Sequence, residues 1–331
     1  MSRLWKFVSC LGLSSFLILS GCTSIRVHLG TRVRLDKLPV RSIAATLPHG
    51  PAIAPGEKSP LVVTLAQPGG KILITEGAGK GKVLWSDLSI AATIVTINKK
   101  GIVSLVHDPR VSDGKIGHLT VTVPTHPDLR AELDIPLRYD YKFTANFPGA
   151  SGDSGLNGSD GSDGISGTPG SSDPNNPAPG GNGTDGSDGS NGQDGGPGGD
   201  APPVLVQVTV RPGTHPLLQI GVTATGHKQR FYLVDPQGGS LAVSADGGSG
   251  GSGGKGGHGG RGGAGGSGSP DGQAGRDGSD GRDGFSGSDG RGGLITVLYD
   301  PQAQPFLSAL PLSSRNGPKP VFHEQSIPPL W

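Results

Sequence analysis

The chain has 331 residues, including 61 glycines and 29 prolines, about 27 per cent together, and a formal net charge of +1. That composition is close to collagen-like and disordered sequences, and the near-zero charge gives no electrostatic basis for nucleic-acid binding. The glycines cluster, however: residues 149–200 hold 18 of them and residues 247–293 hold 24. The rest of the chain has an ordinary glycine content. This excludes a wholly disordered protein and predicts a globular one with two glycine-rich insertions.

Residues 1–21 have the features of a secretory signal peptide. A short positive segment precedes a mostly apolar run, residues 7–19, that is too short to span a bilayer. The run ends in Leu-Ser-Gly-Cys at residues 19–22, which resembles the lipobox of bacterial lipoproteins. The resemblance implies cleavage before Cys22, a diacylglycerol thioether on its sulfur and an acyl chain such as palmitate on its amine. The alternative is a simple signal peptide with an incidental cysteine.

Lipidation at Cys22 implies a membrane partner, because two or three acyl chains give stable anchoring. Cys10 leaves with the signal peptide, so the mature chain has a single thiol and no disulfide. Thr23 follows the cysteine, and in Gram-negative lipoproteins a residue other than Asp there implies sorting to the outer membrane. We therefore expect a lipid-anchored protein of the bacterial cell envelope. Residues 22–38 are predicted to be a tether with a short strand at 24–29.

Residues 39–148 are predicted to form an all-β domain. Turn signals, including one at residues 124–127, separate short alternating or β-branched runs. These runs are residues 61–65, 71–75, 93–97, 102–106, 119–123 and 131–137. Runs at this density favour a β-sandwich. Residues 95–105 are similar to a hairpin of bacterial Ig-like domains, and the resemblance implies a spacer or adhesive module on a cell surface.

A second β unit is predicted from residues 201–246 together with 294–299. Its candidate strands are residues 204–210, 217–224, 230–234, 241–244 and 294–299. If the last strand pairs with the others, both ends of insertion 247–293 are held by neighbouring strands. The proline-rich tail, residues 300–331, is expected to be irregular. The fold class is therefore all-β, with essentially no α-helix after the signal peptide.

Glycine recurs at every third position in the two insertions. It does so through four segments of about 22 residues, joined pairwise by residues 171–179 and 269–271. The segments are residues 149–170, 180–200, 247–268 and 272–293. Period three is the period of the polyproline II helix, which has no internal hydrogen bonds. Glycine clears one face of such a helix, so that a neighbouring backbone can approach and exchange hydrogen bonds.

Three arrangements fit these tracts: a polyglycine II (polyproline II-type) helix bundle within one chain, a collagen-like homotrimeric stalk, and disordered linkers. Scarce proline and equal tract lengths favour the single-chain bundle. The Gly-Gly-X pattern of residues 247–268 also favours the single-chain bundle, because two glycines per triplet would clear two faces of the helix. Each tract would span about 68 Å at about 3.1 Å per residue.

Charges divide unequally between the insertions. Residues 149–200 carry eight Asp and no Lys or Arg, whereas residues 247–293 carry five Lys or Arg and five Asp. The acidic hairpin is therefore expected to lie against the basic one, with ion pairs that set register more than stability. Alternatively, Asp is simply a soluble turn-former. Part of a calcium-binding nonapeptide occurs at residues 180–185, so a weak calcium site at Asp185, Asp188 and Asp194 stays open.

No pattern indicates catalysis. Residues 152–155 imitate a serine-protease motif and residues 77–82 a phosphate loop, but both lack required positions. His118 and His126 are expected to be surface residues. We expect no enzyme, no catalytic residues and no cofactor. The predicted role is structural or adhesive: a rigid glycine-rich bundle that offers a polar surface to a glycan or a surface protein. The alternatives are a passive spacer or collagen-like stalk, and a calcium-dependent surface assembly module.

Overall fold

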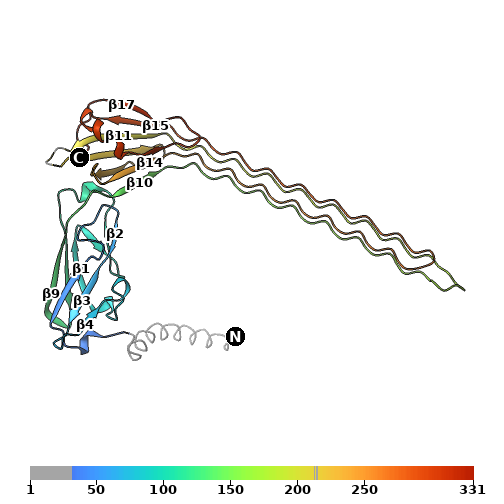
Figure 1. Ribbon diagram of the computed structural model, residues 1–331, viewed down its shortest axis with the longest axis horizontal. Helices are drawn as coiled ribbons and strands as arrows, with labels where there is room; N and C mark the ends of the chain where they lie inside the picture. Colours follow the sequence, from blue (N-terminus) through green and yellow to red (C-terminus); the bar gives the residue numbers. More distant parts are fainter. Residues whose placement is uncertain (1–31, 212, 214) are drawn as a thin grey trace, which may run out of the picture. The chain divides into compact units, whose positions relative to one another are not determined.

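The computed structural model describes residues 32–331 except 212 and 214. The signal peptide, Cys22 and the strand expected at residues 24–29 lie outside these residues. The described chain is largely β-sheet, which confirms the all-β class, and its helical segments are 3₁₀ turns. It divides into two compact units (Figure 1), one formed by residues 32–141 with Phe231–Gly239 and Trp331, the other by residues 142–230 and 240–330. None of the described helices is long and apolar enough to cross a membrane.

Unit 1 contains three antiparallel sheets, with strand orders β1-β3-β4, β2-β7-β6 and β5-β8-β9. Their bounds are β1 (Ser42–Thr46), β2 (Lys58–Pro60), β3 (Val62–Ala66), β4 (Ile72–Ile74), β5 (Ser89–Thr93), β6 (Val95–Ile97), β7 (Ile102–Leu105), β8 (Gly117–Val123) and β9 (His126–Ile135). Burial alternates along β3 and β8, because successive side chains of a strand point to opposite faces. The inward residues, such as Leu65, Leu119 and Val121, form one core.

The predicted runs correspond to β3, β4, β7, β8 and β9 within a few residues. The run expected at 93–97 is divided between β5 and β6, because Ile94 has a left-handed backbone with φ of 67°. The turn expected at 124–127 is wrong in part, since β9 already begins at His126 after a register shift between Thr122 and Val123. Sequence reasoning missed β1, which has five residues, and β2, which has three.

Two further sheets have the orders β13-β12-β11-β15-β17 and β10-β14-β16. The bounds are β10 (Lys142–Asn146), β11 (Val204–Arg211), β12 (Leu217–Ala224), β13 (Arg230–Val234), β14 (Ser240–Ser244), β15 (Ile295–Tyr299), β16 (Leu312–Ser313) and β17 (Val321–Glu324). As expected, residues 294–299 supply a strand, β15, which pairs in parallel with β11.

The proline-rich tail is not irregular, contrary to expectation. It contains the nine-residue 3₁₀ helix η5 (Pro301–Ala309) as well as β16 and β17. Asp300 starts η5 by accepting a hydrogen bond from the backbone N–H of Gln302 (3.0 Å). All four residues of β17 are exposed, so this strand has no alternating pattern that would identify it. The remaining 3₁₀ turns are η1 (Leu35–Lys37), η2 (Gly77–Gly79), η3 (Trp85–Asp87) and η4 (Pro109–Val111).

The glycine-rich insertions form an arm of four extended segments that run side by side (Figure 1). We name them tract 1 (149–170), tract 2 (180–200), tract 3 (247–268) and tract 4 (272–293). Tract 1 follows β10, tract 2 leads into β11, tract 3 follows β14 and tract 4 leads into β15. Tracts 1 and 3 run in one direction and tracts 2 and 4 in the other.

Backbone hydrogen bonds join five pairs of tracts at three-residue intervals: 1 with 2, 1 with 3, 2 with 3, 2 with 4, and 3 with 4. In the middle of the arm, for example, Gly158 N donates to Lys255 O (2.7 Å) and Gly257 N to Ser190 O (2.9 Å). Within the described chain no backbone hydrogen bond joins tract 1 to tract 4. Tracts 2 and 3 therefore lie at the centre of the arm, and tracts 1 and 4 are its two edges.

Candidate interaction surface

The glycines of the arm lie where a side chain would collide with a neighbouring backbone. A Cβ added at any glycine of tract 3 would come within 1.9–2.2 Å of a backbone atom. At Gly256 the obstacle is Gly281 O of tract 4, and at Gly257 it is Ser159 O of tract 1. The Gly-Gly-X pattern of tract 3 thus clears one face for each edge tract. Every non-glycine side chain is pushed to the outside of the arm.

In three of the tracts, Asp and Asn residues at the third position of the Gly-X-Y triplet have a specific task. Their Oδ1 atom accepts a hydrogen bond from a backbone N–H of an adjacent tract, at 2.7–2.9 Å. Tract 1 bonds tract 3 through Asn157, Asp160 and Asp163, tract 2 bonds tract 4 through Asn182, Asp185, Asp188, Asn191, Asp194 and Asp200, and tract 4 bonds tract 3 through Asp277, Asp280, Asp283 and Asp289. These side-chain oxygens thereby satisfy backbone N–H groups that form no backbone–backbone hydrogen bond between tracts.

The register of the arm continues that of the strands beneath it. β10 pairs with β14 at a separation of 98 residues, Lys142 with Ser240, and the side-chain bonds from tract 1 to tract 3 span the same 98 residues. Likewise β11 pairs with β15 at a separation of 91, Val204 with Ile295, and the bonds from tract 2 to tract 4 span 91. The strand pairs therefore determine which triplets of the arm face each other.

One side of the arm carries a row of cations between two acidic rows. The row of tract 3 includes Lys255 and His258. Lys255 Nζ contacts Asp283 Oδ2 (2.7 Å), and His258 Nδ1 lies 3.7 Å from Asp280 Oδ1. The pKa of Asp283 is lowered by the hydrogen bond from Lys255 and then by the N–H of Gly256. The pKa of Asp280 is lowered chiefly by the backbone N–H of Gly259. Both ion pairs lie within residues 247–293. The ion pairs expected between the two hairpins are therefore not the contacts that the structure shows. Instead, Asp and Asn oxygens of the acidic hairpin accept hydrogen bonds from backbone N–H groups of the other hairpin.

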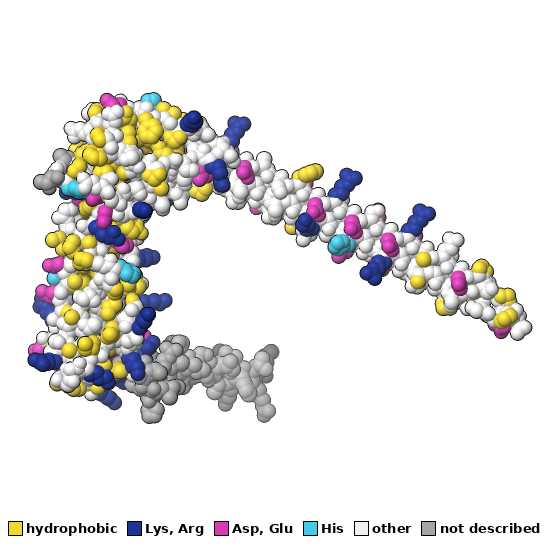
Figure 2. Space-filling view, viewed as in Figure 1, with side chains coloured by type: hydrophobic (Ala, Val, Ile, Leu, Met, Phe, Trp, Pro, Cys, Tyr) yellow, Lys and Arg dark blue, Asp and Glu magenta, His cyan; other side chains and the backbone are white. Residues whose placement is uncertain are grey.

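The second residue of each triplet points outward on the two edge tracts. In tract 4 these outward positions include Arg276, Arg282, Phe285 and Arg291. Among the residues that the structure describes, no carboxylate lies within ion-pair distance of the three guanidinium groups. Figure 2 shows basic and acidic side chains along the arm. The arm's large apolar side chains occupy outward positions too: Leu156 is 67 % exposed, Ile165 75 % and Phe285 79 %.

The weak calcium candidates have a different role in the structure. Asp185, Asp188 and Asp194 each accept a backbone N–H of tract 4 at 2.7 Å, from Arg276, Ser279 and Phe285 respectively. Neighbouring third positions are about 9.3 Å apart along an extended tract, too far to share one ion. Among the described residues no group of three His, Cys, Asp or Glu side chains could hold a metal ion.

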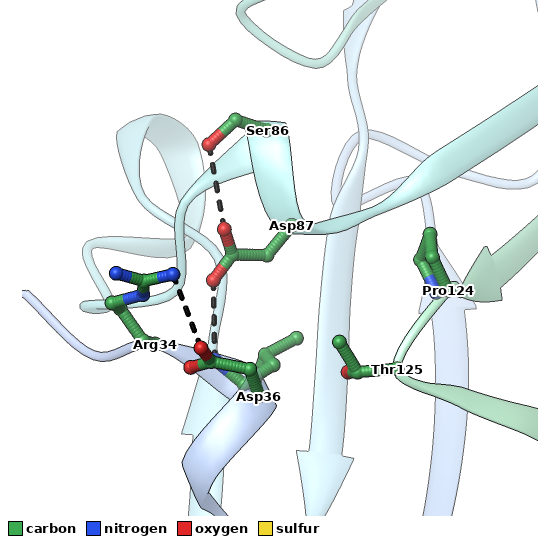
Figure 3. Close-up of a pocket in the computed structure, with 7 residues that line it drawn as sticks. Arg34, Asp36, Ser86, Asp87, Pro124 and Thr125 are labelled. Atoms are coloured by element: carbon green, nitrogen blue, oxygen red, sulfur yellow. Dashed lines mark hydrogen bonds and ion pairs between the residues drawn. The ribbon is translucent and has the colours of Figure 1, made fainter.

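A pocket of about 180 Å³ in unit 1 is lined by Arg34, Leu35, Asp36, Ser86, Asp87, Pro124 and Thr125 (Figure 3). Its charged groups already have partners. Asp87 Oδ2 accepts from Leu35 N (3.2 Å), and Arg34 pairs with Asp36 (3.1 Å). Both contacts hold η1 in place, so these groups support the local fold rather than offering a free binding site.

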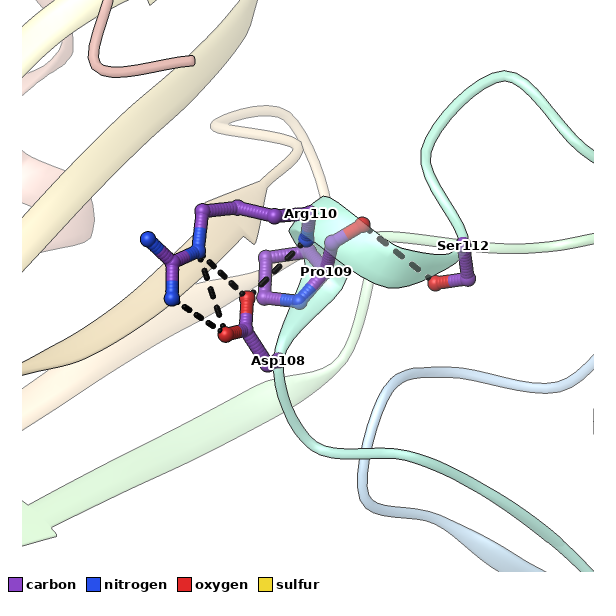
Figure 4. Close-up of polar contacts among 4 residues, drawn as sticks. All are labelled: Asp108, Pro109, Arg110 and Ser112. Atoms are coloured by element: carbon purple, nitrogen blue, oxygen red, sulfur yellow. Dashed lines mark hydrogen bonds and ion pairs between the residues drawn. The ribbon is translucent and has the colours of Figure 1, made fainter.

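A second polar cluster in unit 1 builds the η4 turn (Figure 4). Asp108 accepts from the backbone N–H of Arg110 (3.0 Å) and pairs with its guanidinium (2.7 Å). The hydrogen bond from Arg110 lowers the pKa of Asp108. The same guanidinium lies 3.8 Å from the centre of the Phe231 ring. The cluster is explained by turn formation and cation–π packing.

The histidines expected at the surface lie there. His118 Nδ1 is 2.7 Å from Asp134 Oδ1, and Thr120 Oγ1 is 3.3 Å from His118 Nε2. The order hydroxyl, imidazole, carboxylate is that of a hydrolase triad. These residues lie on the β8–β9 face, where Asp134 is 74 % exposed, and none of them lines the pocket above. Thr125 Oγ1 lies 3.0 Å from His126 Nδ1.

Sequence reasoning missed the capping role of the third-position Asp and Asn residues. A signal was available: Asn replaces Asp at positions 157, 182 and 191, which keeps the acceptor oxygen and removes the charge. Comparison with known proteins adds no assignment. No protein-family model matches this chain, and no curated protein or solved structure is significantly similar to it.

Proposed function

We propose that this chain is a non-enzymatic lipoprotein of the bacterial cell envelope. It is anchored through lipidated Cys22, in the outer membrane, and has a structural or adhesive role. The arm is its interaction surface. The observation that carries the proposal is the construction of the arm, in which backbone hydrogen bonds and Asp or Asn caps create the order. The side chains of the arm form no core and therefore lie on its outside, where most of them are polar.

The arm is best explained as a polyglycine II bundle formed by a single chain. Its hydrogen bonds connect tracts of the same chain, whereas a collagen stalk needs three chains that share one axis. Sedimentation and circular dichroism of residues 23–331 test this. A monomer with a polyproline II-type signal and a cooperative melt supports the bundle. A trimer would support the stalk, and a non-cooperative melt would support disordered linkers.

Unit 1 is proposed to be an Ig-like β-sandwich. The support is one core shared by three antiparallel sheets and the hairpin formed by β6 and β7. In the hairpin turn, Asn98 Oδ1 accepts from the N–H of Lys100 (2.9 Å) and of Ile102 (3.0 Å), and Gly101 has φ of 73°. This is the segment whose sequence is similar to Ig-like domains.

The anchor is tested by metabolic labelling with palmitate in a bacterial host. Wild type should incorporate label and fractionate with the outer membrane, whereas Cys22→Ser should remain unlabelled. A matched Cys10→Ser variant should behave as wild type, because this residue precedes the cleavage site. Labelling of the Cys22→Ser variant would contradict the anchor.

The interaction role is separated from a passive spacer by binding. The full chain and a variant with Arg276→Ser, Arg282→Ser and Arg291→Ser are compared on a glycan array and on intact envelopes. A surface role predicts binding that the variant weakens, since these side chains are exposed and form no hydrogen bond or ion pair within the described part of the chain. Equal or absent binding favours the spacer. A melting temperature raised by calcium would instead favour the calcium-dependent assembly module.

A further inference from the structure

We propose that unit 1 lies on the membrane that holds its lipid anchor and binds the phosphate groups of anionic phospholipids through a cluster of lysines. The proposal rests on the anchor at Cys22 and names the surface of the domain that meets the bilayer. The lysine cluster consists of Lys80, Lys82, Lys99 and Lys100, which are all exposed.

Two loops bring these lysines together. They are residues 76–83 and the turn between β6 and β7, residues 98–101, and each loop supplies two lysines. The loops are adjacent, since a Cβ added at Gly77 would lie 3.9 Å from Lys100 O. The second loop also packs against the buried ring of Trp85. The four lysines therefore belong to one patch on the surface of unit 1.

Carboxylates do not neutralise three of these lysines. Among the residues that the structure describes, Lys80, Lys99 and Lys100 form no ion pair. Glu76, the acidic residue of the first loop, is already paired with Arg32 (2.9 Å). A group of exposed cations of this kind attracts the negative surface of a bilayer that contains anionic lipids.

The lysine cluster lies next to the point where the chain arrives from its proposed anchor. Val33 N donates to Lys82 O (3.0 Å), and Val33 forms a parallel bridge with Val83. Arg32 follows Cys22 by ten residues, and an extended chain spans at most about 3.6 Å per residue, about 36 Å in total. The cluster is therefore within reach of the bilayer surface in which the acylated cysteine is held.

The charge of the arm favours the same arrangement. Residues 149–200 and 247–293 carry 13 Asp and five Lys or Arg, a net charge of −8, whereas unit 1 has 14 Lys or Arg and 11 Asp or Glu. An anionic bilayer attracts the lysine cluster and repels the arm. Unit 1 is therefore the part that contacts the headgroups, and the side chains of the arm remain available to other molecules.

Sedimentation with vesicles tests the lysine cluster in the absence of the lipid anchor. Residues 23–331 are mixed with vesicles of phosphatidylethanolamine and phosphatidylglycerol, or with neutral vesicles in which phosphatidylcholine replaces phosphatidylglycerol. The wild type should pellet with the anionic vesicles at low salt, and much less with neutral vesicles or at high salt. Lys80→Gln, Lys99→Gln and Lys100→Gln together should lower the partition coefficient about 100-fold, the factor for about 3 kcal/mol.

A matched control removes the same number of charges elsewhere. Lys115→Gln, Lys142→Gln and Lys228→Gln alter exposed lysines outside the cluster, so this variant should pellet like the wild type. A second measurement locates the surface. Residues 23–331 contain no cysteine, so Ala78→Cys and Ser288→Cys each introduce a single thiol for a fluorophore. Lipids with a quencher on the headgroup should quench the label at residue 78, in η2, and not the label at residue 288, in tract 4.

Equal pelleting of the wild type and the cluster variant overturns the proposal, as does equal pelleting with anionic and neutral vesicles. Loss of binding in the control variant also overturns it, because net charge rather than the cluster would then be responsible. Self-association of the wild type that the cluster variant abolishes would identify the acidic arm of another copy as the partner instead. Palmitate labelling decides the anchor separately: if Cys22 is labelled and no vesicle binding occurs, the anchor stands and this surface is wrong, whereas vesicle binding with Cys22 unlabelled supports the surface and contradicts the anchor.

Discussion

Gly257→Ala in the middle of tract 3 should open the arm locally. The added Cβ would lie 2.0 Å from Ser159 O, so tracts 1 and 3 must separate by about 1.4 Å to reach the 3.4 Å at which ordinary van der Waals contact begins. That separation weakens three bonds between the same tracts: Gly158 N to Lys255 O (2.7 Å), Gly161 N to His258 O (2.7 Å) and His258 N to Asp160 Oδ1 (2.8 Å). At about 1 kcal/mol each, the loss is about 3 kcal/mol.

Alanine recovers part of this loss by restricting the unfolded chain, about 0.4–1 kcal/mol, which leaves about 2 kcal/mol. Amide hydrogen exchange measures local opening directly. The N–H groups of Gly158 and Gly161, which donate from tract 1 to tract 3, should exchange about 30-fold faster, the factor that corresponds to about 2 kcal/mol. Ser162→Ala is the matched control, because the Ser162 side chain points outward and its backbone bonds remain. Unchanged exchange in Gly257→Ala would refute the close packing of the tracts.

Three further predictions concern register, pH and the core of unit 1. One layer of the arm comprises residues 158–160, 189–191, 256–258 and 281–283, and deleting all of them should shorten the arm by about 9.3 Å and preserve its circular dichroism. Deleting Ser159 alone should disrupt the arm, which hydrogen exchange measured by mass spectrometry would detect. Because the folded pKa values of Asp280 and Asp283 are lowered, their contribution is present above the unfolded pKa of about 4 and is lost as the pH falls through the folded values; an acid titration followed by dichroism should show a lower melting temperature of the arm below about pH 4, and Asp280→Asn with Asp283→Asn should reduce that dependence. Leu119→Ala, at a position with no exposure, should destabilise unit 1 by about 2–5 kcal/mol in urea unfolding and leave the polyproline II-type signal of the arm intact.

The period of the glycines predicted four adjacent extended tracts, because only glycine permits backbones to approach this closely. It also predicted that residues 247–268, with two glycines per triplet, lie between two neighbours; in the structure tract 3 bonds tracts 1, 2 and 4. The partners of each tract could not be derived from the period alone, since any tract of this kind can approach any other. They depend on the pairing of β10 with β14 and of β11 with β15, strands that adjoin the tracts at the base of the arm but lie outside the glycine repeat.

The outward side chains were harder to interpret. An Asp in a soluble repeat is explained equally well as a turn-former, an ion-pair partner or a metal ligand, so composition favoured none of these. The structure assigns the third-position oxygens to backbone N–H groups of adjacent tracts. In the β units, the short or fully exposed strands β2 and β17 were missed because they have no alternation of buried and exposed residues.

Hydrogen exchange on a monomer of residues 23–331 tests whether one chain orders its glycine tracts through backbone hydrogen bonds. Slow exchange is expected at the tract glycines that donate between tracts, among them Gly189, Gly257 and Gly281. Faster exchange is expected in the connecting loop 171–179, and the pattern should not change on dilution. Exchange of these glycines at the rate of an unfolded peptide, or protection found only in a trimer, would contradict the single-chain bundle.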